Sequence, residues 1–286
     1  MTSLRIVSVD EAGFCFGVRR ALQLAREATE RHAEVACLGP LIHNRQVVAE
    51  LEERGMRVTD DIADVPPGSA ALIRAHGAGP QVYEQARERS VQLIDATCPF
   101  VRRVQQAAAG YVAQDYQVLV LGERDHPEAR AIVAHAGDQA TIIESADELE
   151  GMTIGDRVAI VCQTTQRLAN LEELVATLLP RVRELSVANT ICDATSKRQH
   201  ASVGVASQAD LMIVIGGHHS ANTNRLAQIC REAGARTEHI ETADELRREW
   251  LDGVHTVGIT AGASTPPEAV EAVRARLLEM ASGGER

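Results

Sequence analysis

The chain has 286 residues, a length that favours two or three compact units over a single domain. Its net charge of −11 argues against nucleic-acid binding, because that function needs clustered Lys and Arg. The sequence has no signal-peptide pattern and no apolar run long enough to span a bilayer. We therefore expect a soluble cytoplasmic protein that binds neither nucleic acid nor membranes.

Short aliphatic runs alternate with longer amphipathic stretches along the whole chain. This alternation predicts βα units with parallel sheets. Aromatic residues are only 2% of the chain, so Val, Ile, Leu and Ala must fill the core. Strands are predicted at 4–10, 34–39, 70–76, 91–97, 117–123, 141–145, 157–164, 211–217 and 256–262, and helical patterns lie at 44–55, 81–90, 168–182, 224–234 and 266–280.

Three cysteines recur at similar intervals in related surroundings. Cys15 in GFCFGVRR and Cys98 in ATCPFVRR are each followed by two arginines at the fourth and fifth positions. Cys192 in ICDATSKRQ is followed by the basic pair Lys197 and Arg198. A thiolate at a helix start beside arginines has a lowered pKa, which favours metal binding. The spacing predicts three α/β units that bring one cysteine each to a pseudo-threefold axis, with boundaries at 16–97, 98–189 and 190–286, the last completed by 1–15.

The other cysteines and the duplicated arginines have plainer interpretations. Cys37 and Cys162 lie in predicted strands and Cys230 in a predicted helix, which indicates core packing. The arginines fall on the first turns of their helices, where they either pair with surface carboxylates or neutralise a negative cluster. These arginines are Arg19, Arg20, Arg102 and Arg103.

Side chains that can bind a ligand or transfer a proton follow predicted strands and precede predicted helices. In open parallel sheets, ligands bind beyond the carboxyl ends of the strands, so one pocket can gather these residues. Each also has a structural interpretation: the histidines and serines as helix caps, and the glutamate as a first-turn carboxylate. The candidates are His43, His76, His126, Glu128, Thr164, Ser220, Asn222 and Ser264.

Nine ordered motifs together resemble one enzyme family. They are GFCFGVRRA, GPLIHNRQVV, RAHG, DATCP, HPE, QTT, ICDATSKRQ, NTNRL and TAGAST, between about residue 10 and about residue 268. The set resembles the 4-hydroxy-3-methylbut-2-enyl diphosphate reductases, which catalyse the last step of the non-mevalonate isoprenoid pathway. The resemblance implies reductive loss of the substrate hydroxyl as water, with two electrons and two protons, giving isopentenyl and dimethylallyl diphosphate.

The resemblance also implies roles for individual residues. Cys15, Cys98 and Cys192 would hold a [4Fe–4S] cluster with one iron open to the substrate, in a central cleft between the three units. Glu128 would supply a proton, Thr164 would help to orient the substrate hydroxyl and relay a proton, and His126 would be the third catalytic residue. The diphosphate would bind to His43, His76, His126, Ser220, Asn222 and Ser264. Reduced ferredoxin or flavodoxin would supply electrons.

Two other functions compete with this one. A non-catalytic iron–sulfur redox sensor needs the three thiols but leaves Glu128 and the phosphate donors without a task. A three-cysteine zinc hydrolase needs a water in the fourth position, and metal content and colour distinguish it. One departure from the family pattern is Ala221, which stands where many members have a second serine.

Overall fold

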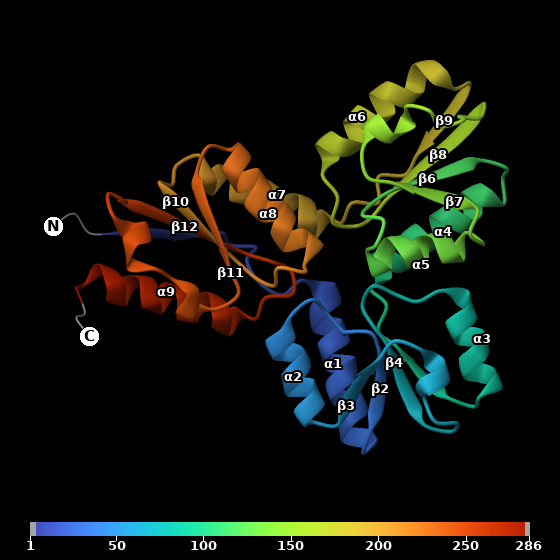
Figure 1. Cartoon of the computed structure of the whole chain (residues 1–286), viewed down its shortest axis with the longest axis horizontal. Helices are drawn as coiled ribbons and strands as arrows, with labels where there is room; N and C mark the ends of the chain where they lie inside the picture. The colour runs from blue at the N-terminus through green and yellow to red at the C-terminus, as the bar shows by residue number, and fades with distance from the viewer. Residues whose placement is uncertain (1–3, 284–286) are drawn as a thin grey trace. The chain divides into compact units, whose positions relative to one another are not determined.

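The computed structural model describes residues 4–283 and has α/β architecture (Figure 1). Three four-stranded sheets carry helices on their faces, and all strand pairs in them are parallel over residues 4–283. The predicted α/β class with parallel sheets is therefore confirmed. The structure divides into two compact units, one containing the residues up to Val18, His43–Val47 and the residues from Asp193 onward, the other Arg19–Ile42 and Val48–Cys192.

The larger unit contains two of the sheets. The first has the strand order β3-β2-β4-β5, and α3 packs against one of its faces. The second has the order β7-β6-β8-β9, with α4 and α5 on one face and α6 on the other. From Phe16 to Asp95 the elements are α1 (Phe16–Arg31), β2 (Val35–Leu38), α2 (Arg45–Glu53), β3 (Met56–Thr59), β4 (Ala70–Ile73), α3 (Pro80–Glu88) and β5 (Gln92–Asp95). From Pro99 to Val187 they are α4 (Pro99–Val112), β6 (Gln117–Leu121), α5 (Pro127–His135), β7 (Ala140–Ile143), β8 (Arg157–Cys162), α6 (Leu168–Leu178) and β9 (Glu184–Val187).

The other unit contains the third sheet, with the order β1-β12-β10-β11. Its edge strand β1 comes from the start of the chain and pairs with β12, from Arg5 opposite Thr256 to Ser8 opposite Ile259. Helices α7 and α8 cover one face and α9 the other. These elements are β1 (Arg5–Ser8), α7 (Asp193–Ala206), β10 (Leu211–Ile215), α8 (Ala221–Glu232), β11 (Arg236–Ile240), β12 (Thr256–Ala261) and α9 (Pro267–Ala281).

The three sheets share one topology. In each, one strand lies between the two strands that follow it in sequence (β2 between β3 and β4, β6 between β7 and β8, β10 between β11 and β12), and a fourth strand lies beside the last of these. In the third sheet β1 takes that fourth place. The repeated topology agrees with the expectation of three related α/β units, while the predicted domain boundaries stay a prediction.

Aliphatic side chains fill the interior, as the low aromatic content predicts. The largest fully buried side chains are all Leu or Ile, among them Leu72, Leu119 and Ile160. Over residues 4–283, no helix has the length and apolar character needed to cross a bilayer. Short 3₁₀ helices at Ile62–Asp64, Ala146–Leu149, Leu179–Arg181, Ala243–Glu245 and Arg248–Leu251 complete the connections.

Three strands escaped the sequence prediction: β3, β9 and β11. Each is an edge strand of its sheet. Their sequences, MRVT, ELSV and RTEHI, mix charged and apolar residues, and each strand is only partly buried. An edge strand faces solvent along one side, so its aliphatic signal is weak.

Candidate active site

Two of the candidate ligand cysteines lie in the larger unit, each just before a helix. Cys98 is the N-cap residue of α4, and its side chain makes no capping hydrogen bond there. Its backbone N–H donates to the carbonyl of Ala75 over 3.0 Å. Cys192 immediately precedes α7, and its N–H donates to the carbonyl of Thr164 over 3.0 Å. Both residues are partly exposed, so backbone bonds to neighbouring loops hold thiols that are not packed into the core.

The remaining cysteines provide an internal contrast. Cys37, Cys162 and Cys230 have no exposed surface and lie in β2, β8 and α8. Burial raises the pKa of each thiol to about 12. A thiol that keeps its proton at neutral pH is a poor metal ligand. The predicted core-packing role of these three residues is confirmed.

Glu128 and Thr164 form a buried pair in the larger unit. Glu128 lies in the first turn of α5 but is only 2% exposed, because its side chain turns inward. Its carboxylate accepts two hydrogen bonds from Thr164, one from the N–H over 2.6 Å and one from the hydroxyl over 2.9 Å. Burial raises the pKa of Glu128 to about 7, although the bonds from Thr164 act in the opposite direction. Such a carboxyl group can hold and release a proton near neutral pH.

His126 and His76 lie next to this pair. His126 is the N-cap of α5, and its Nδ1 accepts a hydrogen bond from the N–H of Glu128 over 3.2 Å. This bond places the ring proton on Nε2. The ring of His76 meets that of His126 edge to face, with 5.2 Å between centroids. His126 therefore has the capping role that the sequence allowed, and its capping bond uses only one ring nitrogen.

These contacts join the candidate residues of the larger unit in one series. The backbone N–H of Cys98 is hydrogen-bonded to the carbonyl of the residue before His76. The ring of His76 contacts that of His126, and the ring of His126 is hydrogen-bonded to the backbone N–H of Glu128. Glu128 is bonded to Thr164, whose carbonyl accepts from Cys192. Loops that follow β4, β5, β6, β8 and β9 supply these residues, as expected where carboxyl ends of parallel strands meet.

The smaller unit holds Cys15, His43 and Ser264. The N–H of Cys15 donates to the carbonyl of Ala263 over 3.1 Å, and the hydroxyl of the adjacent Ser264 donates to the carbonyl of His43 over 3.1 Å. Gly217 makes this approach possible, because a Cβ at that position would lie 2.8 Å from the carbonyl oxygen of His43. The loops after β10 and β12 therefore meet the His43 segment closely.

The start of α8 combines a helix cap with an unusual buried amide. Ser220 is the N-cap, and its hydroxyl accepts from the N–H of Thr223 over 3.3 Å. Asn222, in the first turn, is only 4% exposed. Neither its amide nitrogen nor its amide oxygen has a hydrogen-bond partner among the described residues. A buried amide without a partner costs free energy, so a ligand that satisfies it is the natural explanation.

The duplicated arginines divide into different roles. Arg102 forms an ion pair with Asp95 at 2.7 Å, and Arg103 stacks over the Phe100 ring at 5.5 Å. Arg20 instead donates to the backbone carbonyls of Thr97 and Asp95. The interpretation of these arginines as partners of surface carboxylates holds for Arg102 and is wrong for Arg20, because loop carbonyls lie within reach of its guanidinium.

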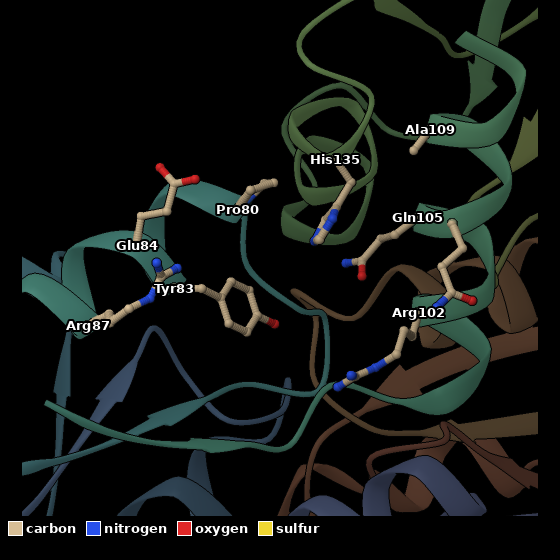
Figure 2. A pocket seen from close by; sticks show the side chains of 9 residues that line it. Pro80, Tyr83, Glu84, Arg87, Arg102, Gln105, Ala109 and His135 are labelled. Carbon is tan, nitrogen blue, oxygen red and sulfur yellow. The ribbon is translucent and has the colours of Figure 1, made fainter. Parts of the chain in front are cut away.

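A separate pocket of about 470 Å³ lies between α3 and α4, and Figure 2 shows side chains from both helices reaching into it. None of the candidate site residues lines it. Its charges nearly balance, because Arg102 pairs with Asp95 and Glu84 lies one turn from Arg87 on α3. The pocket therefore offers no excess charge for an ionic ligand. Its lining residues are Pro80, Tyr83, Glu84, Arg87, Arg102, Gln105, Gln106, Ala109 and His135.

Comparison with known proteins decides the family. The LytB protein family matches residues 6–278. The chain belongs to the LytB family. A 4-hydroxy-3-methylbut-2-enyl diphosphate reductase of Pelobacter propionicus is 43% identical over 277 residues, covering 97% of this chain and 99% of the relative. One of Geobacter sulfurreducens is 44% identical over 276 residues, covering 96% of this chain and 98% of the relative.

Two solved structures of LytB relatives are similar to this chain. The E-1-hydroxy-2-methyl-but-2-enyl-4-diphosphate reductase of Plasmodium falciparum superposes with a TM-score of 0.92 at 26% identity, over 97% of this chain and 88% of that one. An (E)-4-hydroxy-3-methyl-but-2-enyl diphosphate reductase, described as the terminal enzyme of the non-mevalonate pathway, gives a TM-score of 0.71 at 39% identity, over 96% and 99%. The resemblance seen in the sequence motifs is confirmed.

Proposed function

We propose that this LytB protein is a 4-hydroxy-3-methylbut-2-enyl diphosphate reductase that forms isopentenyl and dimethylallyl diphosphate. Relatives at 43% and 44% identity over nearly the full chain carry that activity in their names. The structural observation that supports the chemistry best is the buried Glu128–Thr164 pair, because it provides a proton source next to Cys192, whose N–H donates to the carbonyl of Thr164. The reaction consumes two electrons and two protons and releases the substrate hydroxyl as water.

The three cysteines fit an iron–sulfur cluster. Each precedes a helix and is partly exposed, whereas the other three are fully buried with a raised pKa. Thiolates are the protein ligands of such clusters, and a helix N-terminus favours the thiolate form. Cys15, Cys98 and Cys192 would hold the cluster. When bound, it supplies electrons and one iron without a protein ligand, to which the substrate hydroxyl can bind.

The diphosphate would bind to side chains at helix starts. Ser220 and Asn222 open α8, where backbone N–H groups point toward an anion. The amide nitrogen of Asn222 is a buried donor that awaits a partner, which suits a phosphate oxygen. Ser264, His43, His76 and His126 complete the proposed set. Ala221 lacks the hydroxyl that many family members have, and a backbone amide or a water would take its place at the diphosphate.

Glu128 would deliver a proton to the carbon skeleton after the hydroxyl leaves. Its raised pKa, about 7, keeps a large fraction protonated at neutral pH. Thr164 orients the carboxyl group through two hydrogen bonds, so its hydroxyl can also relay a proton. His126 fixes the start of α5 by accepting from the Glu128 N–H. All three residues keep their geometry through contacts inside one compact unit.

No G-x-G-x-x-G dinucleotide fingerprint follows the first strand, so the electrons must come from outside the chain. We propose reduced ferredoxin or flavodoxin as the donor. A purely regulatory iron–sulfur protein has no use for a buried, proton-holding Glu128 beside Thr164. A three-cysteine zinc hydrolase needs no electron donor and gives a colourless protein.

Anaerobic turnover tests the proposal. The protein is reconstituted with iron and sulfide, given 4-hydroxy-3-methylbut-2-enyl diphosphate and a chemical reductant, and the products are quantified by mass spectrometry. We expect isopentenyl and dimethylallyl diphosphate from the wild type. Glu128→Gln should turn over about 10²–10⁴-fold more slowly, since a positioned acid contributes about that factor. Equal turnover by this variant would show that Glu128 is not the proton donor. A wild-type protein that is brown but forms no product would contradict the reductase activity and favour the redox-sensor alternative.

A further inference from the structure

Arg20 stabilises a loop distant from it in sequence. It lies on α1, five residues after Cys15, yet its guanidinium donates to the carbonyl of Thr97 over 3.1 Å and to that of Asp95 over 3.4 Å. Asp95 is the last residue of β5, and Thr97 lies in the short segment that leads from β5 to Cys98. The side chain of Asp95 reinforces the same loop by accepting from the N–H of Thr97 over 2.9 Å.

Arg198 does the same for another loop. It lies on α7, six residues after Cys192, and is only 3% exposed. Its Nε donates to the carbonyl of Glu11 over 2.8 Å, and its Nη2 donates to the carbonyl of Gly13 over 2.7 Å. These carbonyls belong to the loop between β1 and Cys15. Gly13 adopts φ +97°, a conformation that favours glycine.

The chemistry of these contacts suits arginine alone. Each guanidinium donates to two backbone carbonyls two residues apart, and its planar arrangement of N–H groups matches two acceptors at once. A lysine offers one compact charge and cannot span both carbonyls with the same geometry. Hydrogen bonds from a charged donor are about twice as strong as neutral ones. Both arginines therefore hold the backbone just before a cysteine.

We propose that Arg20 and Arg198 are positioning residues, each extending from the helix after one candidate ligand cysteine to fix the loop before another. Arg20 follows Cys15 and fixes the loop of Cys98, and Arg198 follows Cys192 and fixes the loop of Cys15. This inference rests on the proposed function only in treating the cysteines as cluster ligands. It gives a reason for an arginine soon after Cys15 and after Cys192, whereas the arginines after Cys98 contact Asp95 and Phe100.

Amide hydrogen exchange in the cluster-free protein tests the crossed pattern. In Arg20→Met, amides 96–98 should exchange about tenfold faster or more, given the strength of a charge-assisted hydrogen bond, while amides 12–15 stay unchanged. In Arg198→Met the effects should be reversed. Arg103→Met is the matched control, because Arg103 follows Cys98 as Arg20 follows Cys15 but stacks on Phe100. It should leave both loops at the wild-type rate.

Conservative variants guard against a simple loss of folding. Arg20→Lys and Arg198→Lys keep the charge, so they should retain the overall melting transition while showing the same local acceleration. Unchanged exchange before Cys98 in both Arg20 variants would overturn the proposal, as would acceleration before Cys15 instead. After anaerobic reconstitution, both lysine variants should lose iron faster than wild type. A wild-type protein that takes up no iron would refute the proposed cluster. The hydrogen-exchange pattern of the cluster-free protein would still test whether Arg20 and Arg198 hold the two loops.

Discussion

At the scale of single residues, Glu128 carries the clearest chemical signature. Its carboxyl group is buried, accepts two bonds from Thr164, and has a pKa raised to about 7 from 4.5. The folded protein therefore keeps a proton that the unfolded chain releases between these two pH values. Stability falls as the pH rises through this interval, because the folded state binds more protons than the unfolded state.

Glu128→Gln should remove this pH dependence. At pH 8 the cluster-free variant should be more stable than wild type by on the order of 3 kcal/mol, the value of a shift of this size. Near pH 4.5 the difference should shrink to about 0.4 kcal/mol, because the glutamate is then neutral in the folded protein and only half ionised in the unfolded chain. Urea unfolding at the two pH values measures it. The same stability difference at both values would show that Glu128 does not titrate as described.

Asn222 should show a trade-off between stability and binding. Its amide is 4% exposed and lacks partners among residues 4–283, so the free energy of burying it is not recovered without a ligand. Asn222→Leu should therefore leave the unfolding free energy unchanged or higher, while weakening substrate binding at least tenfold, about 1.4 kcal/mol. Calorimetric unfolding and the substrate KM measure the two effects. A destabilised variant with a normal KM would mean that Asn222 is structural.

At the scale of elements, the loops after the strands decide the site. The loop after β4 shows how tightly these loops are packed. Its residue Gly77 has φ +81°, and a Cβ there would lie 2.4 Å from the side-chain amide nitrogen of Gln105 on α4. This glycine follows His76, so the turn that presents the histidine packs directly against α4. No larger residue fits without moving one of them.

Gly77→Ala should cost more than the 1–2 kcal/mol of a left-handed residue, because the clash adds to it. Shortening Gln105 to alanine should relieve the clash but not the backbone strain. The double variant should thus be more stable than the sum of the two single losses predicts. Denaturant unfolding of all four proteins gives this coupling. Strict additivity would contradict a direct contact between the turn and α4.

Much of the element pattern was predictable from sequence, and the exceptions have a common cause. Central strands such as β10 read as aliphatic runs because helices cover both faces, whereas the edge strands β3, β9 and β11 have mixed sequences. The motifs also predicted that candidate residues follow strands and precede helices. They could not predict the inward turn of Glu128, which depends on its contact with Thr164, nor the carbonyl partners of Arg20 and Arg198, which lie far away in sequence.

At the scale of the whole molecule, one topology occurs three times and the beginning of the chain completes the third sheet. Each repeat delivers a cysteine between a strand and a helix. The family match over residues 6–278 covers all three sheets. No single sheet with its helices contains the full set of candidate ligands, because Cys15, Cys98 and Cys192 follow strands of three different sheets.

Iron and sulfide content across single cysteine variants tests the central claim most directly. After anaerobic reconstitution, wild type and the buried-cysteine variants Cys37→Ala, Cys162→Ala and Cys230→Ala should each hold about four irons and four sulfides per chain. Cys15→Ser, Cys98→Ser and Cys192→Ser should each hold far less and lose the brown absorbance. Full iron in any of these last three, or its loss in a buried-cysteine variant that remains folded, would contradict the account.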